Sequence, residues 1–354
     1  MTPTGHYTAV RASDMGPAKT SSPGPGEVEL VPAYVGVCDA DLPGLHRTTG
    51  SRLKRPAVLG HEMSGLIVQA GPGVRAWQPG DAVTVMPLRW DSVCPVCRTG
   101  HQRTCRAGHQ HTCRHLDFIG VDSPGAMQQR WTVPAATLVR LPPAVPLRSA
   151  ALVVPTAVAV HDISRADVRS GDRVLVVGGG PVGLLIALVA RAAGADTRIV
   201  EPSSRRRQVA ADLQLIAWDP AMDNVAALIA RWTGPTGPDV TFAVSGTTDG
   251  LVTVVDALPV RGRLCLVATH PKPCLANLRL FFQRELTLAN ARTYHLPDYT
   301  KALALIEDGT VPADKLISKV IPLTAVASEF ESSECADDVM KILVDCGGDA
   351  GTRT

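Results

Sequence analysis

One stretch limits the possible folds of this chain more than any other: VLVVGGGPVGLLIALVARAAG, from Val174 to Gly194. Its apolar start is typical of a strand buried on both faces of a parallel sheet, and LLIALVARAA predicts the helix that follows. The glycines between them fit G-x-G-x-x-G, which lets the backbone approach a pyrophosphate at the helix N-terminus. This strand, loop and helix context predicts a dinucleotide-binding site. The expected contacts are Gly178, Gly180, Pro181, Val182 and Gly183.

The next predicted strand ends in a carboxylate that bears on cofactor choice. Glu201 closes the segment RIVE, and a carboxylate there accepts hydrogen bonds from the adenosine ribose. Because it would repel a 2′-phosphate, the sequence favours NAD over NADP. Arg205, Arg206 and Arg207 follow, and a guanidinium can bind that phosphate, so NADP stays open. Alternatively, these arginines form the solvated start of the next helix. Arg206 is included among the predicted cofactor contacts.

Strands and helices alternate after the glycine loop. DVTFAVS and GRLCLVAT are typical of strands, and NVAALIARW and GLVTVVDAL of helices, which predicts a doubly wound parallel sheet over residues 151–290. Residues 1–150 instead show short strands punctuated by Gly and Pro, which indicates a separate β-rich domain. Two domains are also expected for 354 residues. The predicted fold class is therefore α/β.

Three candidate zinc ligands come from the first domain. Cys38 ends a strand-like segment, and His61 and Glu62 follow in GHEMSG. A catalytic zinc takes three protein ligands of the Cys, His and carboxylate kinds and leaves its fourth position for water or substrate. The alternative is a paired His and Glu beside a buried cysteine, without metal.

A second cysteine cluster, in a lobe over residues 91–120, predicts a structural zinc, because four thiolates close a tetrahedral shell. The lobe contains CRTGHQRT followed by CRAGHQHT, which indicates a local duplication. A second quartet is therefore open, with Asp91 in place of Cys113. Histidine substitution and thiols without metal are further alternatives. The preferred ligands are Cys94, Cys97, Cys105 and Cys113, and the nearby histidines are His101, His109, His111 and His115.

Charge and hydropathy exclude several other classes. The 35 basic residues nearly balance the 33 acidic ones, so neither a nucleic-acid nor a membrane partner is expected. The N-terminus lacks the pattern of a signal peptide, and no apolar run is long enough to span a bilayer. The nine cysteines are better explained as metal ligands than as a disulfide scaffold. We therefore expect a cytoplasmic enzyme with a small-molecule substrate.

These motifs follow the order found in zinc-dependent medium-chain dehydrogenases/reductases, the alcohol, threonine and polyol dehydrogenase family. GHEMSGLIVQAGPGV, GDAV, the cysteine-rich lobe, the glycine loop and LFFQRELTL together make a resemblance to its polyol branch that covers nearly the whole chain. The resemblance implies that residues 1–150 and 291–354 form a GroES-like β-barrel catalytic domain and that residues 151–290 form a Rossmann cofactor domain. It further implies a homo-oligomer, either dimer or tetramer. It also implies that Cys38, His61 and Glu62 hold a catalytic zinc.

The chain departs from that family at two polar positions. Ala40, in CDAD, stands where a hydroxyl residue usually starts the proton relay, and Val154 stands where a glutamate usually lies near the zinc. Another group or water must then carry the proton, and His46 and Asp39 are the candidates. Because Val154 replaces that glutamate, the sequence predicts a drier, more electrophilic metal.

The substrate contacts are the last prediction. Arg292 and Tyr294, in NARTY, resemble the polyol branch's pair near the cleft, although a structural ion pair would also explain the arginine. Trp90 and His161 are further candidates, with core packing favoured for His161. The predicted activity is hydride transfer between nicotinamide and a secondary alcohol or ketone, such as a polyol or cyclitol. The alternatives are an enone reductase in which zinc polarises the carbonyl, and a cofactor-binding protein without catalysis.

Overall fold

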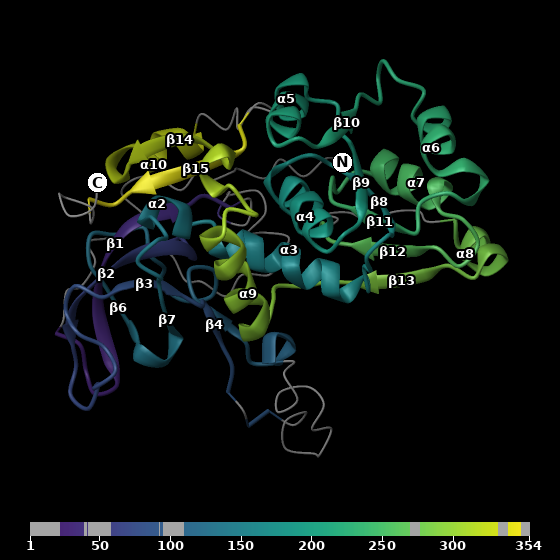
Figure 1. The fold of residues 1–354 in the computed structure, drawn as a ribbon. Helices are drawn as coiled ribbons and strands as arrows, with labels where there is room; N and C mark the ends of the chain where they lie inside the picture. Colours follow the sequence, from purple (N-terminus) through teal and green to yellow (C-terminus); the bar gives the residue numbers. More distant parts are fainter. Residues whose placement is uncertain are drawn as a thin grey trace, which may run out of the picture. The chain divides into compact units, whose positions relative to one another are not determined.

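The computed structural model describes residues 22–38, 41, 58–91, 93–94, 110–269, 277–331 and 339–347. The chain divides into two compact units. The catalytic unit comprises Met1–Val154, Ile317–Ala336 and Lys341–Thr354, and the cofactor unit comprises Pro155–Leu316 and Asp337–Met340. Figure 1 labels the elements of both.

The catalytic unit is built on a seven-stranded sheet with the order β14-β15-β1-β2-β3-β7, to which β6 is added by pairing with β1. Strand β1 carries the core: Val28, Leu30, Ala33 and Val35 are fully buried. Register shifts in the β1–β2 pairing bend the strands, as in a closing barrel. The strands are β1 (Glu27–Gly36), β2 (Glu62–Ala70), β3 (Ala82–Val85), β6 (Trp131–Pro134), β7 (Leu138–Arg140), β14 (Ile317–Pro322) and β15 (Lys341–Asp345).

Strand register in this sheet brings distant sequence segments together. In the antiparallel β1–β2 pair, Gly36 lies opposite Glu62, so the residues after β1 meet the residues before β2. On the other side of β1, Gly36 lies opposite Leu343 of β15, near the end of the chain. The smaller elements of the unit are β4 (Leu88–Arg89), β5 (Asp117–Phe118), η3 (Gln110–Thr112), η4 (Ala135–Thr137), α2 (Leu147–Ala150), η7 (Leu323–Ala325) and α10 (Val326–Glu331).

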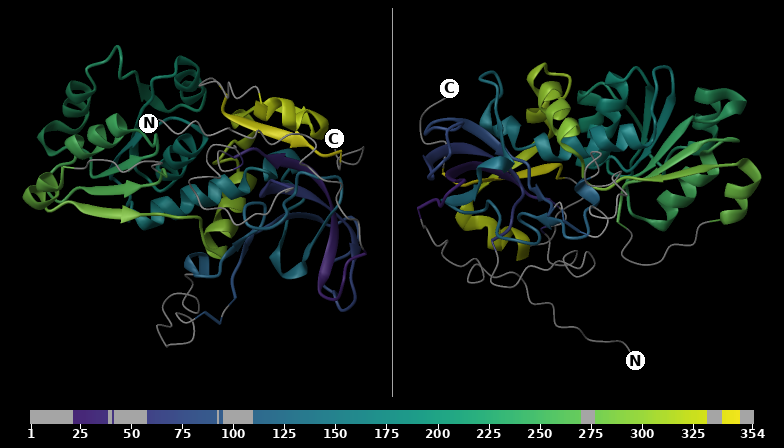
Figure 2. Two further views of the ribbon diagram at one scale, coloured as in Figure 1. Left: turned by 180° about the vertical axis from the view of Figure 1, so that it is seen from behind. Right: turned by 90° about the horizontal axis from the view of Figure 1, so that it is seen from below.

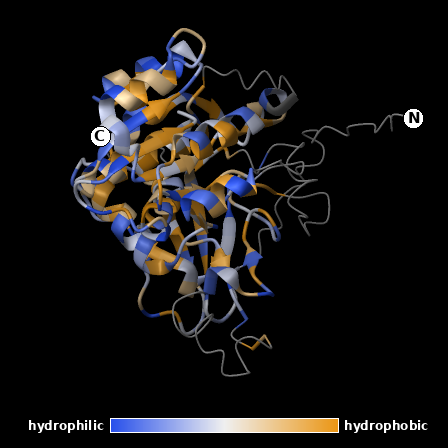
Figure 3. Cartoon of the chain, turned by 90° about the vertical axis from the view of Figure 1, so that its right-hand side faces the viewer, coloured by the Kyte–Doolittle hydropathy of each residue, from blue (hydrophilic) through white to orange (hydrophobic). Residues whose placement is uncertain are grey.

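The cofactor unit confirms the predicted doubly wound sheet. Its six strands pair in the order β10-β9-β8-β11-β12-β13, each pair parallel. Helices lie on both faces of the sheet (Figures 1 and 2). The inner strands β8 and β11 are hydrophobic and buried (Figure 3), since both of their faces are covered, whereas the edge strands β10 and β13 are more exposed. The six strands are β8 (Arg173–Val177), β9 (Asp196–Val200), β10 (Ile216–Trp218), β11 (Val240–Ala243), β12 (Arg263–Leu266) and β13 (Thr287–Asn290).

The helices of this unit explain where the chain leaves it. Sequence patterns placed the return to the first domain at residue 291, whereas the contacts keep the chain in the cofactor unit through Leu316. The reason is α9, whose Asp298 bonds to His161 of α3 within the same unit. None of the described helices has the length and apolarity needed to cross a membrane. The helical elements are α3 (Val153–Arg165), α4 (Pro181–Ala192), α5 (Ser204–Asp212), α6 (Val225–Thr233), η5 (Gly234–Thr236), α7 (Thr248–Ala257), α8 (Leu278–Arg284), α9 (Leu296–Glu307) and η6 (Ala313–Leu316).

Candidate active site

The structure brings the three predicted ligands of the catalytic metal together. One ligand atom from each of Cys38, His61 and Glu62 lies within 4.8 Å of the others. Cys38 follows β1 and is half-buried, whereas His61 directly precedes β2, Glu62 is the first residue of β2, and both are buried. The convergence follows from the β1–β2 register. We call this group the Cys-His-Glu trio.

Two glycines make room for the trio. Gly60 has φ +99°, and a Cβ there would lie 2.7 Å from Val35 Cγ1. A Cβ at Gly36 would lie 2.2 Å from Oε2 of Glu62. Gly60 must be glycine because its φ is positive, and Gly36 leaves room for the Glu62 carboxylate because it has no side chain. The G of GHE therefore has a local structural cause.

A carboxylate that sequence reasoning missed stands behind His61. Asp41 is fully buried, and its Oδ1 lies 3.6 Å from Nδ1 of His61. Its Oδ2 accepts a hydrogen bond from the Cys38 backbone N–H at 2.9 Å. Burial raises the pKa of the Asp41 carboxyl above its ordinary value, while His61 and the Cys38 N–H act against that rise. The C-x-x-D spacing was the available signal, since such a spacing lets an aspartate bond back to the residue three positions before it.

The second missed residue is a buried lysine from the far end of the chain. Nζ of Lys341 lies 2.8 Å from Oε2 of Glu62 and donates to the Val37 carbonyl at 3.0 Å. Both charged side chains are almost wholly buried, at 6% and 3% exposure. The signal was a lone lysine opening the apolar strand KILVD. Lys341 therefore holds Glu62 in place and joins β15 to the trio.

The donor set of the trio fits zinc. A thiolate, an imidazole and a carboxylate are the ligands of catalytic zinc sites, and a carboxylate behind the histidine is their usual orienting partner. Nδ1 of His61 and Oδ1 of Asp41 are buried and make no hydrogen bond. Since Nδ1 faces Asp41, Nε2 is the nitrogen of His61 suited to a metal. Val154, at the position expected to lack a carboxylate, is buried at 3% exposure.

The glycine loop fits a dinucleotide. Gly178 has φ +112°, and a Cβ on Gly183 would lie 1.9 Å from the Gly178 carbonyl oxygen, so both positions require glycine. Gly180 caps α4, and Pro181 and Val182 open that helix. Backbone N–H groups at such a helix start are suited to a pyrophosphate.

The environment of Glu201 separates the roles of Arg206 and Arg207. The carboxylate is buried and accepts from the backbone N–H of Gly179 at 2.6 Å and of Ser203 at 2.8 Å. Arg207 bonds to the Glu201 carbonyl and pairs with Asp219 at 2.7 Å. Arg206 instead faces the loop, with Nη1 4.0 Å from Glu201 Oε2, and its Nε is buried without a hydrogen-bond partner. Arg206 is thus the arginine placed for a bound nucleotide.

The cysteine-rich lobe combines members of both predicted quartets. Ligand atoms of Asp91, Cys94 and Cys113 lie within 4.8 Å of one another. Oδ1 of Asp91 accepts from the Cys94 backbone N–H at 3.0 Å, and Oδ2 contacts Nδ1 of His115. The His115 contact lowers the pKa of the Asp91 carboxyl to about 2. Thiolates and carboxylates are both donors that zinc takes, and the other two preferred ligands, Cys97 and Cys105, lie outside the described residues.

The remaining predicted residues have mixed outcomes. Arg292 is exposed and Tyr294 is buried, while His161 is buried at 1% exposure, as core packing predicted. Trp90 lies at the surface of the catalytic unit, at 36% exposure. The positions outside the described residues are Asp39, Ala40, His46, Cys97, His101, Cys105 and His109.

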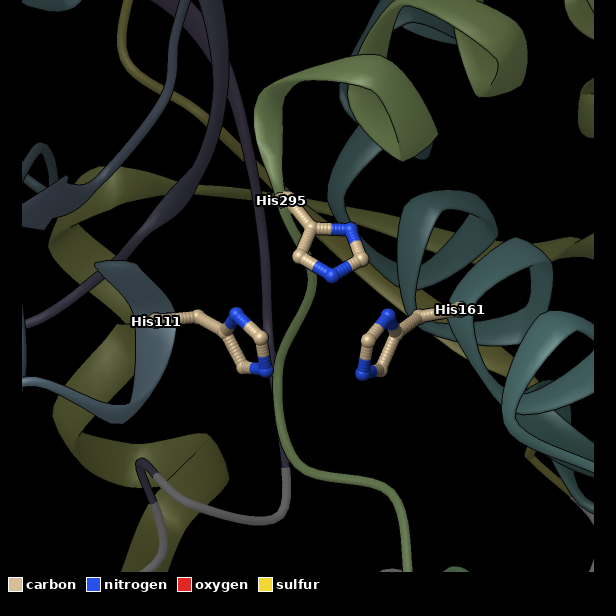
Figure 4. A group of neighbouring side chains, drawn as sticks. All are labelled: His111, His161 and His295. Atoms are coloured by element: carbon tan, nitrogen blue, oxygen red, sulfur yellow. The ribbon is translucent and has the colours of Figure 1, made fainter. Parts of the chain in front are cut away.

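A histidine pair in the cofactor unit was also missed. The rings of His161 on α3 and His295 before α9 meet edge to face, with centroids 4.5 Å apart (Figure 4). Oδ2 of Asp298 lies 2.9 Å from Nδ1 of His161 and 2.5 Å from Nδ1 of His295. We call these three residues the His-Asp-His cluster. No sequence signal joins them, because His161 lies far from the others along the chain.

Comparison with known proteins gives two matching family models. Residues 24–143 match the alcohol dehydrogenase GroES-like domain. Residues 181–308 match the zinc-binding dehydrogenase domain. The first match covers the trio, and the second begins at Pro181, within the glycine loop.

Individual proteins match over nearly the whole chain. The 2-dehydro-3-deoxy-L-galactonate 5-dehydrogenase of Pseudoalteromonas atlantica is 38% identical over 328 residues, covering 93% of this chain and 94% of the relative. The structure of 2R,3R-butanediol dehydrogenase from Bacillus subtilis has a TM-score of 0.81 and 29% identity, covering 93% of this chain and 95% of the other. A zinc-binding dehydrogenase from Sinorhizobium meliloti bound to NADP has a TM-score of 0.85 and 26% identity, covering 95% and 98%.

Proposed function

Since the chain belongs to the zinc-binding dehydrogenases that carry an alcohol dehydrogenase GroES-like domain, we propose that it interconverts a secondary alcohol and a ketone on a sugar acid or polyol, using zinc and a nicotinamide cofactor. The predicted family and fold are confirmed by these matches, and the chain is an alcohol/ketone oxidoreductase at the level its relatives share. We propose a sugar acid because the 38% identical relative is named as the dehydrogenase of a sugar acid.

The observation that carries the proposal is the Cys-His-Glu trio, backed by Asp41 and Lys341. A zinc ion held by Sγ of Cys38, Nε2 of His61 and the Glu62 carboxylate would polarise the substrate oxygen as a Lewis acid. Asp41 orients the imidazole, and Lys341 fixes the carboxylate. A nicotinamide in the cofactor unit would exchange hydride with the substrate carbon.

NAD is the proposed cofactor. The buried Glu201 carboxylate lies against the loop at Gly179, where it can accept from a ribose hydroxyl and would repel a 2′-phosphate. Arg206 supports binding of the nucleotide from the other side. We expect kcat/KM for NAD to exceed that for NADP by about 10-fold or more, because an uncompensated like-charge contact costs at least roughly 1.4 kcal/mol. Glu201→Gln should lower the ratio of kcat/KM for NAD to kcat/KM for NADP.

Self-association through the edge of the cofactor unit is also proposed. Strand β13 ends the strand order, and Leu288 on it is 48% exposed. Leu278 and Phe282 of the neighbouring α8 are 72% and 86% exposed. An exposed apolar edge favours pairing with a second copy. Light scattering on wild-type protein and on Phe282→Glu tests this, with a shift to monomer expected in the variant.

The test of the activity is a substrate screen with zinc-replete protein. Sugar acids, 2-keto-3-deoxy sugar acids, polyols, cyclitols and cyclic enones are each incubated with NAD, NADP or their reduced forms, and nicotinamide absorbance and product mass are recorded. We expect a two-hydrogen change at a carbinol or ketone. A saturated ketone would instead identify an enone reductase, and no turnover with any compound would leave the cofactor-binding alternative.

A further inference from the structure

Two short paired strands of the catalytic unit flank the metal-binding part of the cysteine-rich lobe. β4 ends before Asp91 and Cys94, and β5 begins after Cys113. The strands pair antiparallel, with Leu88 opposite Phe118. A metal bound by ligands from both sides would close the loop between β4 and β5, and so would restrict where Phe118 lies.

Phe118 connects these strands to the trio. Its ring meets the imidazole of His61 edge to face, with the ring centroids 4.8 Å apart and the ring planes at 65°. This is a preferred geometry for aromatic pairs. Asp41 faces the same imidazole at Nδ1, with its Oδ1 3.6 Å away. The imidazole proposed to bind the metal is therefore restrained by a buried carboxylate and by an aromatic ring at the end of the lobe.

The chain after β5 also packs on the turn that carries His61. The Ala126 backbone N–H donates to the Gly60 carbonyl at 2.9 Å. A Cβ on Gly120 would lie 2.4 Å from that carbonyl oxygen and 3.1 Å from Cβ of His61. A Cβ on Gly125 would lie 2.3 Å from the same oxygen. This segment therefore lies directly against the turn, and a change in its path would move His61.

Hydrogen bonds join the segment after Phe118 to the paired strands. The Phe118 backbone N–H donates to the Asp122 carboxylate at 3.1 Å, and the Phe118 carbonyl accepts from the N–H groups of Val121 and Asp122 at 2.9 and 2.7 Å. The Ile119 N–H donates at 2.8 Å to the carbonyl of Pro87, directly before β4. Ile119 and Val121 are also buried. A displacement of β5 therefore reaches the segment against His61, because close-packed groups transmit strain.

We propose that the lobe and the trio bind zinc cooperatively, and that Phe118 is the positioning residue that couples them. With the lobe loaded, β5 holds Phe118 against His61, and the imidazole is oriented for the metal of the trio. With the lobe empty, the imidazole keeps Asp41 but its aromatic restraint is loosened, so zinc binds more weakly at the trio. This inference rests on the trio being the metal site of the proposed function.

The test measures the zinc affinity of each site when the other site is disabled. Competition with a chromogenic chelator is applied to wild-type protein, to Cys113→Ser and to His61→Ala. We expect Cys113→Ser to weaken zinc binding at the trio by about 10-fold, the lower end of what losing an orienting partner costs. Because coupling between binding sites is reciprocal, His61→Ala should weaken zinc binding in the lobe by the same factor. A wild-type affinity at the remaining site of either variant overturns the proposal.

A double-mutant cycle tests whether Phe118 carries the coupling. Phe118→Leu removes the ring and keeps an apolar side chain. In that background, Cys113→Ser should change zinc binding at the trio by less than about twofold, because the connection is already broken. Phe118→Tyr keeps the ring and should keep the full effect of Cys113→Ser. An undiminished effect of Cys113→Ser in the Phe118→Leu background refutes the role of Phe118, since a merely structural side chain would leave the coupling unchanged.

Trp77 offers the matched control in the same unit. Its ring packs under the guanidinium of Arg140, with the guanidinium carbon 4.6 Å from the ring centroid. Trp77→Leu therefore also removes an aromatic contact, but not one to His61. It should keep wild-type zinc affinities and the full coupling, and a loss of coupling in this variant would contradict the assignment to Phe118.

The remaining outcomes separate this inference from the proposed function. If Cys113→Ser does not fold, Phe118→Leu alone decides, because it should weaken zinc at the trio by about 10-fold and a wild-type affinity overturns the proposal. Zinc binding that is independent at the two sites refutes the coupling and leaves the proposed function standing. A wild-type zinc content in His61→Ala refutes the metal site of the proposed function first, and the coupling with it.

Discussion

The molecule contains two histidine sites that share one device and differ in their other neighbours. His61 has Asp41 behind Nδ1 at 3.6 Å, and His295 has Asp298 at 2.5 Å. Around His61 stand a thiol and a second carboxylate, whereas around His295 stands another imidazole. A carboxylate behind an imidazole fixes its orientation in both cases. We propose that the thiol and the second carboxylate suit the outer nitrogen of His61 to a zinc ion.

The largest effect should come from His61→Ala. We expect bound zinc to fall by about one equivalent per chain, because a catalytic zinc has only three protein ligands. Activity should fall by at least about 10³-fold, because Lewis-acid stabilisation is worth several kcal/mol and each 1.36 kcal/mol is tenfold. Metal analysis beside steady-state kinetics checks both values.

The comparison gives this experiment its control. His295→Ala should keep all of its zinc, since His295 is not one of the proposed ligands of the trio. If His61→Ala and His295→Ala lost the same amount of zinc, the assignment of the metal to the trio alone would be wrong. Undiminished zinc in His61→Ala would remove the metal assignment of the trio.

The second effect concerns stability without metal. Lys341→Met leaves the buried Glu62 carboxylate without its cation, and breaking a buried ion pair typically costs about 3–5 kcal/mol. Zinc on Glu62 would compensate part of that charge, so the loss should be larger in chelator than in zinc-loaded protein. Urea unfolding under both conditions measures the difference.

A surface pair provides the matched control for that measurement. Lys319 and Glu329 lie at nearly the same distance, 2.7 Å, but the lysine is 48% exposed. Lys319→Met should therefore cost at most about 1 kcal/mol, independently of zinc. If Lys341→Met behaved like Lys319→Met, the idea that Lys341 secures a metal ligand would fail.

The third effect separates the two orienting carboxylates. Asp41→Asn should weaken zinc binding by about 10–100-fold, the usual consequence of losing such a partner, and should leave NADH binding unchanged. Asp298→Asn should leave zinc affinity unchanged, because its carboxylate lies against His161 and His295 rather than His61. Competition with a chromogenic chelator and steady-state kinetics distinguish them. A reversed pattern would mean that the roles have been exchanged.

Local spacing explains how much of this could be predicted. The strand, glycine loop and helix around Gly178 are contiguous, so both the parallel sheet and the dinucleotide site were readable. His61 and Glu62 are adjacent, and Cys38 needed only one strand pairing to join them. Lys341 and Asp298 required knowledge of which distant elements pack together. Periodicity reports which face of a strand or helix is buried, but not which charged partner comes from elsewhere in the chain.

The smallest effect tests whether the proton already has a route. Ala40→Ser restores the hydroxyl that the family usually has at this position, and we expect it to raise kcat for alcohol oxidation by about threefold or less, because the predicted zinc ligands are unchanged. Steady-state kinetics of the oxidation, with zinc content measured beside them, check this. A much larger gain would show that the proton route of the native chain is incomplete, and a lower kcat would contradict the prediction.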